Sequence, residues 1–204
     1  MQSLGSGFTG FIDLQGRFIK YKINGFDDNP GIDIDENYSF FNPKAGVSFN
    51  KNNYQAYFSF SVGSKEPNRD DYEAGASQIP KPEILYDAEL GMEKKGDIFN
   101  YGATFYYMYY HDQLVNTGKI NDVGAYTRTN TPESYRAGVE LQAGAIITKW
   151  MNFSGNISFS QNKIKTFTEF IDDYDNGLQK ENIYHNSDIS FSPGIVGAPG
   201  VNFI

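Results

Sequence analysis

The sequence predicts an all-β fold of antiparallel, up-and-down transmembrane β-barrel strands, about eight in number, with short periplasmic turns and long extracellular loops. Three observations support this fold class. Apolar and polar side chains alternate with a period of two, short and long connections alternate along the chain, and the two faces of each strand suit different solvents. No apolar run approaches the roughly 18 residues that a transmembrane helix needs, so that class is excluded.

The alternation is clearest at 54–62, where Phe58 and Phe60 share one face and Ser59 and Ser61 share the other. Such a pattern is typical of a strand whose two faces meet different solvents. Strands are expected over or near 8–24, 40–50, 54–62, 84–92, 98–110, 135–145, 151–160 and 187–197.

The connections between these strands differ in length in a regular way. Short connections with turn residues or charges are expected at 50–53, 94–97, 148–150 and 198–200. Long ones are expected at 24–38, 63–81, 111–134 and 161–188. Strict alternation places every long loop at one end of the sheet, which is typical of a transmembrane β-barrel.

The polar strand faces are rich in Ser, Asn, Gln and Gly, with Glu and Arg among them. This composition suits a water-filled or plugged lumen, while the apolar faces suit lipid. The strands also reach the roughly 9 to 11 residues that a tilted strand needs to cross a bilayer. The aromatic run at 105–110 is compatible with an interfacial girdle or, alternatively, with an exposed sheet edge.

Composition excludes several classes of function. The chain has no Cys, so a disulfide scaffold, a zinc-thiolate site and a cysteine nucleophile are excluded. A net charge of -8 argues against nucleic acid as a partner, because phosphate binding needs a basic surface. The aromatic content of 16% argues against intrinsic disorder.

The predicted long loops hold 18 of the 25 acidic residues but only 8 of the 17 basic ones. One interpretation is a plain solvated face, and the other is a face that gathers cations. The acidic residues that favour the second interpretation most strongly are Asp27, Asp28, Asp33, Asp35 and Glu36.

No motif in the sequence predicts catalysis, a metal centre or a cofactor. The segments 33–36 and 172–177 resemble calcium loops, but they lack flanking helices and the glutamate at the twelfth position of an EF-hand. His111 and His185 do not form a zinc site without a third ligand. We therefore expect a protein that is not an enzyme and has no cofactor.

A charged cluster at 66–72 predicts a structural role at a strand end. Pro67 ends the preceding strand, and Glu66, Arg69 and Asp70 are placed to tie the loop down. A network of this kind at a barrel mouth is expected to stabilise the loop rather than to bind a substrate.

Five segments also carry a family resemblance, namely 40–46 (FFNPKAG), 66–72 (EPNRDDY), 81–91 (KPEILYDAELG), 112–118 (DQLVNTG) and 134–140 (SYRAGVE). In this order they resemble the barrel of a TonB-dependent outer-membrane receptor of the Bacteroidetes type, over nearly the whole chain. The resemblance implies a barrel of about 22 strands closed by an N-terminal plug domain. It also implies energy-coupled uptake of a scarce nutrient, such as a ferric siderophore, across the outer membrane of a Gram-negative bacterium.

Three features depart from the family pattern. The chain has no plug and no TonB box, about eight strands are too few for the family's wall, and 201–204 follow the predicted turn at 198–200. We therefore expect residues 1–204 to be a partial barrel domain that lacks the plug and the C-terminal strands.

The resemblance implies three partners, which are outer-membrane lipid, the TonB complex through the missing plug, and a substrate for which an iron chelate is a candidate. In the family, substrate contacts come from loops and plug apices. The corresponding vestibule residues expected here are Asp27, Asp28, Asp33, Asp35, Glu36, Asn116, Asn121 and Arg128. Two alternatives are a small passive barrel or porin-like channel, and a soluble β-rich carbohydrate-binding module that uses exposed tyrosines.

Overall fold

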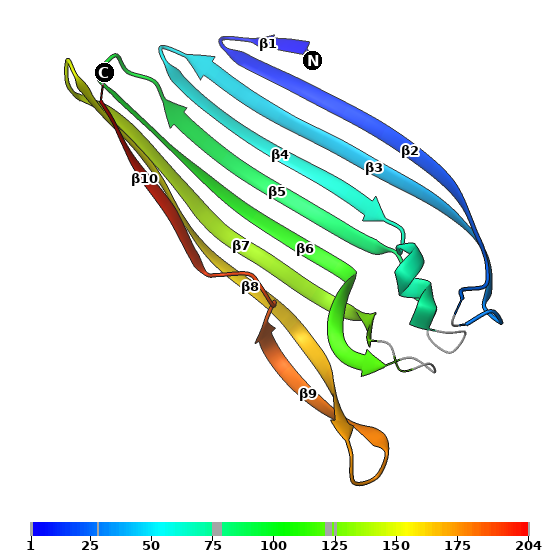
Figure 1. The fold of residues 1–204 in the computed structure, drawn as a ribbon. Coiled ribbons are helices and arrows are strands. Elements are labelled where there is room, and N and C mark those ends of the chain that lie inside the picture. Colours follow the sequence, from blue (N-terminus) through cyan, green and yellow to red (C-terminus); the bar gives the residue numbers. More distant parts are fainter. Residues whose placement is uncertain (1, 28, 75–78, 121–123, 125, 204) are drawn as a thin grey trace.

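The computed structural model describes residues 2–27, 29–74, 79–120, 124 and 126–203. They form one antiparallel sheet of ten strands with a single short 3-10 helix, η1 (Arg69–Ala74) (Figure 1). The strands are β1 (Gln2–Gly5), β2 (Phe8–Asn24), β3 (Asp33–Lys51), β4 (Tyr54–Lys65), β5 (Glu83–Lys94), β6 (Phe99–Ile120), β7 (Tyr126–Thr148), β8 (Met151–Asp173), β9 (Leu178–Asp188) and β10 (Ile195–Phe203). Each strand from β1 to β8 pairs with the next, and both β9 and β10 pair with β8.

The short connections lie together at the end of the sheet that also holds both termini, and the long ones lie at the opposite end (Figure 1). The β3–β4 connection shows why a short turn suffices. Asn52 and Asn53 adopt φ values of 51° and 64°, the left-handed conformation that a two-residue hairpin turn requires and that asparagine tolerates. The connections predicted to be short and those predicted to be long thus lie at opposite ends of the sheet, as expected, although two of the latter prove to be mostly strand.

The register gives the sheet two chemically different faces. On the outer face, Ala45, Phe60, Ala88, Tyr107 and Ala137 lie opposite one another from β3 to β7. The neighbouring row on the inner face is polar or charged at every position but Met108: Asp13, Lys44, Ser61, Asp87, Met108, Arg136 and Asn162. Since directly opposed residues share a face, the whole sheet keeps this division.

The outer face exposes large apolar side chains that no other element covers. Ile12 is 76% exposed, Phe18 82% and Phe41 62%. A continuous apolar surface of this kind in water would be a liability, whereas hydrocarbon is the solvent that it suits.

The aromatic run at 105–110 is divided between the two faces. Phe105, Tyr107 and Tyr109 point outward with the apolar row, while Tyr106 points to the inner face. Tyr107 and Tyr135 stack with ring centroids 6.0 Å apart on the outer face. Only the outward members therefore suit the predicted interfacial girdle.

Aromatic rings on the inner face lie over glycines of the adjacent strand. The ring of Tyr57 occupies the space of a Cβ at Gly91, and the ring of Tyr106 occupies that of a Cβ at Gly138. In each pair the two residues are directly opposed in the register. Glycine at these positions lets a large ring lie flat on the backbone, which explains why it occurs inside strands.

Two predicted loops prove to be extensions of strands. Much of 111–134 belongs to β6 and β7, and 161–188 is mostly the hairpin of β8 and β9. The backbone pairing continues past the apolar part of the sheet, from Lys163 opposite Asp188 to Asp173 opposite Leu178. Because apolar and polar side chains are mixed on both faces there, the period-two signal disappears although the strand does not.

The predicted turn at 198–200 is wrong, and so is the expectation that 201–204 follow a turn. Residues 195–203 form one strand, β10, in which Pro199 lies opposite Gly155 of β8. Among the described strands β10 pairs on one side only, and an edge strand tolerates a proline because its missing N–H can face away from the ladder. With β1 and β9 added, the sheet has ten strands rather than about eight.

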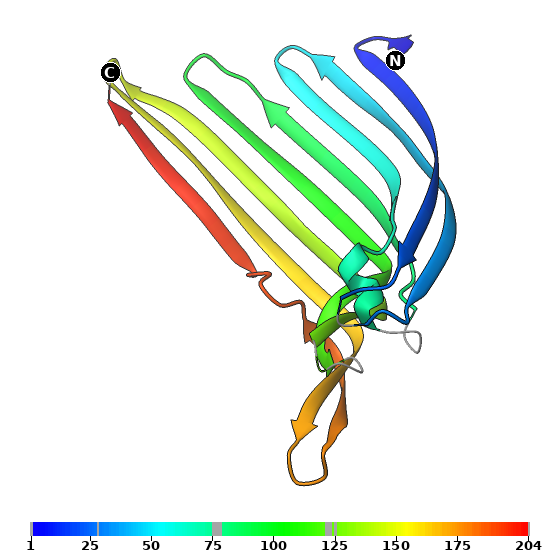
Figure 2. The same ribbon diagram turned by 45° about the vertical axis from the view of Figure 1, so that its right-hand side comes forward.

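The sheet is strongly curved but open in the described part of the chain, because its outermost strands β1 and β10 do not pair with each other (Figure 2). The described residues therefore form a section of a curved wall.

Within the described ranges, no helix has the length and apolar character needed to cross a membrane.

Candidate functional site

Helix η1 lies against the inner face of the sheet at the end with the long connections. Its Tyr72 is only 1% exposed and packs with a small apolar cluster that includes Ile23 and Phe26. The Tyr72 ring stacks on Tyr21 of β2 with centroids 5.4 Å apart, and its hydroxyl group is hydrogen-bonded to that of Tyr38 on β3. Residues 69–74 of the β4–β5 connection therefore fold back over the inner face, at the end of the sheet that holds the long connections.

Burial raises the pKa of Tyr72, and the hydrogen bond with Tyr38 raises it further. The phenol is consequently neutral at physiological pH. Tyr72 acts as a packed anchor of η1 and does not supply a phenolate ligand.

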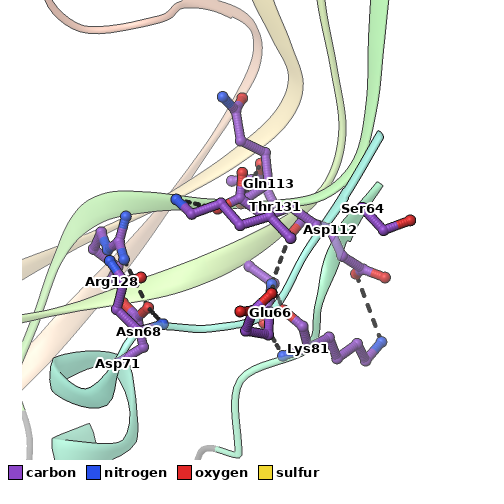
Figure 3. A network of polar contacts seen from close by, with 12 residues as sticks. Ser64, Glu66, Asn68, Asp71, Lys81, Asp112, Gln113, Arg128 and Thr131 are labelled. Carbon is purple, nitrogen blue, oxygen red and sulfur yellow. Dashed lines mark hydrogen bonds and ion pairs between the residues drawn. The ribbon is translucent and has the colours of Figure 1, made fainter. Parts of the chain in front are cut away.

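A forked ion pair joins the β4–β5 connection to β7 (Figure 3). Arg128 donates from Nε to Asp71 Oδ1 at 2.7 Å and from Nη2 to Oδ2 at 2.6 Å. The backbone N–H of Asn68 also donates to Asp71 Oδ2 at 2.7 Å. Asp71 is 2% exposed, so its charge depends on these three bonds for compensation.

The same connection is held at both of its ends. Near its start, Arg17 donates to Glu66 at 2.5 Å and to the carbonyl oxygen of Ser64 at 2.9 Å. Near its end, the backbone N–H of Lys81 donates to Asn130 Oδ1 at 2.8 Å, and the Asn130 amide donates back to the Lys81 carbonyl at 3.0 Å (Figure 3). These contacts tie the connection to β2 and β7.

The acidic residues predicted for the vestibule separate onto different faces. Asp33 and Asp35 lie on the outer face, where Asp35 is 3.9 Å from Lys20 and 4.0 Å from Lys22. Glu36 lies on the inner face opposite Tyr21. Of these three carboxylates, only Glu36 faces the space enclosed by the curve of the sheet.

The remaining predicted vestibule residues lie on different elements of the chain. Asp27 is exposed in the β2–β3 connection, and Asn116 and Arg128 lie opposite each other on β6 and β7. Asp28 and Asn121 lie outside the described residues. The structure thus places Asn116 and Arg128 opposite each other, and their role as vestibule residues stays a prediction.

Of the three residues predicted to tie the loop down, Glu66 and Arg69 contact other parts of the chain, whereas Asp70 is exposed. Glu66 binds Arg17, and the Arg69 guanidinium lies 4.9 Å from the centroid of the Phe26 ring. Asp70 is exposed, whereas its neighbour Asp71 makes the buried ion pair. Sequence alone could not distinguish two adjacent aspartates, since the winding of η1 decides which one points inward.

Among the hollows on the inner face of the described sheet, two share Arg136 and Phe191 in their linings. The loop-side hollow, nearer the long connections, has a volume of about 470 Å³. It is lined by Gln113, Asn116, Arg128, Arg136, Tyr184 and Phe191 among others. The turn-side hollow, nearer the short connections, has a volume of about 610 Å³. It is lined by Glu89, Tyr106, Arg136, Glu140, Asn156 and Phe191 among others. Such volumes fit small-molecule ligands. Sequence reasoning missed Phe191, whose position depends on a local break between β9 and β10.

The inner face carries more acidic than basic groups from the short turns up to the row through Asp13. The carboxylates there are Asp13, Asp87, Glu89, Glu93 and Glu140, and the cations are Lys44, Arg136 and Lys95 of the adjoining turn, which lies 3.6 Å from Glu93. Asp87 Oδ1 is buried without a hydrogen-bond partner among the described residues. The described residues contain no group of three or more His, Asp or Glu side chains arranged to hold a metal ion. The arrangement suits binding and passage rather than bond chemistry.

Comparison with known proteins places this geometry in context. Residues 11–200 match the model of a protein family described as TonB dependent receptor-like, beta-barrel. No curated protein sequence matches the chain.

Three similar solved structures are the siderophore receptor PiuA from Acinetobacter baumannii, the ferric-catecholate import receptor Fiu from E. coli K12 and the alcaligin receptor FauA from Bordetella pertussis. PiuA has 17% identity and a TM-score of 0.67, covering 95% of this chain and 28% of its own. Fiu has 15% and 0.60, covering 96% and 29%. FauA has 17% and 0.55, covering 79% and 28%. The fold is shared, and the chain spans less than a third of the length of each of these structures.

Proposed function

This chain belongs to the family of TonB-dependent receptor β-barrels, and we propose that it forms part of the wall of an outer-membrane transporter that takes up a scarce nutrient. The family consists of receptors rather than enzymes. We further propose that the nutrient is an iron chelate such as a ferric siderophore, and that uptake is driven through the TonB complex.

The division of the sheet into an apolar outer face and a polar inner face is the observation that carries this proposal. Exposed residues such as Ile12 and Phe18 suit lipid, while the row through Lys44, Asp87 and Arg136 suits an aqueous or protein-filled lumen. A wall with these two faces belongs in an outer membrane of the Gram-negative type.

The uneven charge of the inner face supports a second part inside the barrel. Carboxylates outnumber cations there, and the buried Asp87 Oδ1 has no hydrogen-bond partner among the described residues. A buried carboxylate oxygen needs compensation, which a plug domain with basic side chains would supply. Through such a plug the receptor would contact the TonB complex.

The iron chelate is supported by the names of the similar structures, which are receptors for siderophores or ferric catecholates. Within this chain, Glu36, Asn116 and Arg128 are the predicted vestibule residues that face the enclosed space. We keep them as proposed substrate contacts. Asp27 and Asp28 stay predictions, as do Asp33, Asp35 and Asn121.

The two alternatives gain no support from the geometry. A small passive barrel needs the first and last strands to pair, and β1 and β10 are the unpaired ends of the described sheet. A soluble carbohydrate-binding module would not expose a continuous apolar face.

Uptake of a radiolabelled ferric siderophore tests the proposal. Iron-starved cells with the intact receptor are compared with cells lacking its gene, each with and without TonB. We expect accumulation only when both the receptor and TonB are present and the proton-motive force is intact. Accumulation that continues without TonB would indicate a passive channel and would overturn the proposal.

A further inference from the structure

An apolar hollow lies on the outer face of the sheet, toward the end with the short connections. Its volume is about 720 Å³, and no polar side chain lines it. The lining residues include Gly10, Ile12, Ala45, Val47, Phe58 and Phe60. These six belong to β2, β3 and β4, each of which is paired on both sides, so the hollow does not depend on an open edge of the sheet.

The outer face changes from apolar to cationic between this hollow and the short turns. The row of the register next to the hollow holds Phe8 and Phe49, whose ring centroids are 4.8 Å apart. The following row holds Lys51, Tyr54 and Lys94, which lie opposite one another on β3, β4 and β5. A phospholipid has the same order of groups, with its acyl chains followed by the glycerol and then the phosphate.

The depth of the hollow below the lysines suits this order. Lys51 lies four residues beyond Val47, which is roughly 13 Å along the strand and roughly 10 Å of depth at a tilt of about 40°. The polar layer of one leaflet is about 5 to 8 Å thick. With the lysines among the headgroups, the hollow therefore lies in the hydrocarbon.

The two lysines carry charges that no carboxylate compensates. Neither Lys51 nor Lys94 takes part in an ion pair among the described residues. From the row of Ala45 to the short turns, the outer face of the described strands contains no Asp or Glu. At the loop end, by contrast, Lys165 of the outer face lies 2.7 Å from Glu133. An anion is therefore favoured at the turn end of this face.

The neighbouring turns do not cancel this excess of positive charge. Their surroundings contain two carboxylates, Glu93 and Asp97, and two further cations, Lys95 and Lys149. Lys95 lies 3.6 Å from Glu93. The charges of these four residues balance, which leaves those of the lysine row available to a partner.

Tyr54 positions one of the two ammonium groups. The Lys94 Nζ donates to the Tyr54 hydroxyl at 2.8 Å and lies 4.5 Å from the centroid of its ring. Because Tyr54 stands between the lysines in the register, this contact brings the Lys94 ammonium closer to Lys51, whose Cα is two strand spacings or roughly 10 Å away. An ammonium has three donors, so Lys94 keeps two for a phosphate.

We propose that the outer face at the turn end binds an anionic phospholipid, with its phosphate on Lys51 and Lys94 and one acyl chain in the hollow between β2 and β4. The two ammonium groups supply charge-assisted hydrogen bonds to the phosphate oxygens, and the hollow buries apolar area of the chain. The site rests on the proposed function in placing the sheet in an outer membrane, where short turns face the periplasm.

A local fluorescence measurement on the purified intact receptor in detergent tests the site. A cysteine at Leu90, which lies opposite Phe58 beside the hollow, carries a bimane label once any cysteines elsewhere in the receptor are replaced. Phosphatidylglycerol and phosphatidylcholine with identical brominated acyl chains are added in turn, and quenching of the label reports the lipid bound at this place. Only phosphatidylglycerol has a net negative charge, so we expect it to quench at the lower mole fraction.

Two kinds of variant separate the headgroup from the chain. Lys51→Gln or Lys94→Gln should weaken phosphatidylglycerol binding about fivefold and the double variant about twentyfold, without affecting phosphatidylcholine. Replacing both lysines by Arg should retain the binding, because the charge is kept. Ala45→Phe fills the hollow and should weaken the binding of both lipids.

Matched controls come from the same face of the sheet. Lys20→Gln with Lys22→Gln removes two outer-face cations at the loop end, where Asp35 lies within 4.0 Å of each, and should leave quenching at Leu90 unchanged. A label at Phe18, on the outer face near those lysines, should be quenched equally by the two lipids. Circular dichroism checks that each variant is folded.

Equal quenching at Leu90 by the two lipids, or phosphatidylglycerol binding that survives loss of both lysines, would overturn the site. An unchanged affinity in Ala45→Phe would overturn the placement of the acyl chain. TonB-dependent iron uptake alongside either result would leave the proposed transport function standing. Conversely, lysine-dependent phosphatidylglycerol binding by a receptor without TonB-dependent uptake would support the site and overturn the proposed transport function.

Discussion

The buried ion pair of Asp71 and Arg128 is the residue-scale contact that holds η1 against β7. Asp71 lies in η1 and Arg128 in β7, so one forked interaction joins segments 57 residues apart in the chain. A buried charge that loses its partner is strongly destabilising, because its desolvation is no longer compensated. The adjacent Asp70 is exposed and provides a natural comparison.

Arg128→Ala should destabilise the packing of η1 by about 3 kcal/mol, since Asp71 is left as an uncompensated buried charge. Hydrogen exchange of the β4–β5 connection in the intact receptor measures this loss. Asp70→Asn is the control and should change it by less than about 0.5 kcal/mol. Equal protection in Arg128→Ala and the unaltered receptor would contradict the assigned role.

The glycines beneath aromatic rings give a second residue-scale prediction. Gly91→Val should destabilise the sheet by about 1 to 3 kcal/mol, because the new side chain and the Tyr57 ring need the same space. Gly63→Ala on β4 is the matched control, since a Cβ there meets nothing within 4 Å. Denaturant unfolding of the receptor in detergent measures both. A Tyr57→Ala background that fails to reduce the effect of Gly91→Val would contradict the explanation.

At the scale of elements, the hairpin of β8 and β9 extends beyond the rest of the wall (Figure 1). Its tip is closed by Asp173, which accepts hydrogen bonds from Lys180 at 2.8 Å and from the Asn176 amide at 2.8 Å. The bond from Lys180, followed by that from Asn176, lowers the pKa of Asp173 below its ordinary value of 3.8. The tip is therefore tied by a charged aspartate throughout the physiological range.

A lowered pKa in the folded state fixes the sign of the pH dependence. The stabilisation from Asp173 is fully present above pH 3.8 and is lost as the pH falls through the lower folded value. Hydrogen exchange at the tip should be slow at pH 5 relative to its intrinsic rate and should lose protection at more acidic pH. Asp173→Asn should abolish this acid transition, and a transition that persists in that variant would assign it to another group.

At the scale of the whole chain, the described residues form a curved sheet with two open edges and one apolar face. Unpaired edges and apolar surface both promote association in water. The chain of residues 1–204 expressed alone should therefore sediment as aggregates without detergent and be dispersed by detergent. A monodisperse, folded monomer in plain buffer would contradict the assignment of the outer face to lipid.

Sequence reasoning succeeded where one face of a strand is apolar and the other polar, and it failed where both faces are mixed. The expected strand at 54–62 lies within β4, because Phe58 and Phe60 mark one face and Ser59 and Ser61 the other. β9 escaped detection because its side chains are mixed on both faces, and Pro199 suggested a turn inside β10. The sequence predicts Arg128 as a vestibule residue but not its buried partner Asp71, whose position depends on the winding of η1. The position of Phe191 depends on the break between β9 and β10, which no local pattern predicts.

Alternating solvent exposure along β6 is the most direct test of the central claim that this chain is a section of a transmembrane barrel wall. The chain contains no cysteine, so single cysteines at 104–108 can carry spin labels in the intact receptor in lipid, once any cysteines elsewhere are replaced. Labels at Phe105 and Tyr107 should be accessible to oxygen, which dissolves in lipid. Labels at Thr104, Tyr106 and Met108 should not share that accessibility. Uniform accessibility along these five positions, or oxygen accessibility on the opposite face, would contradict the claim.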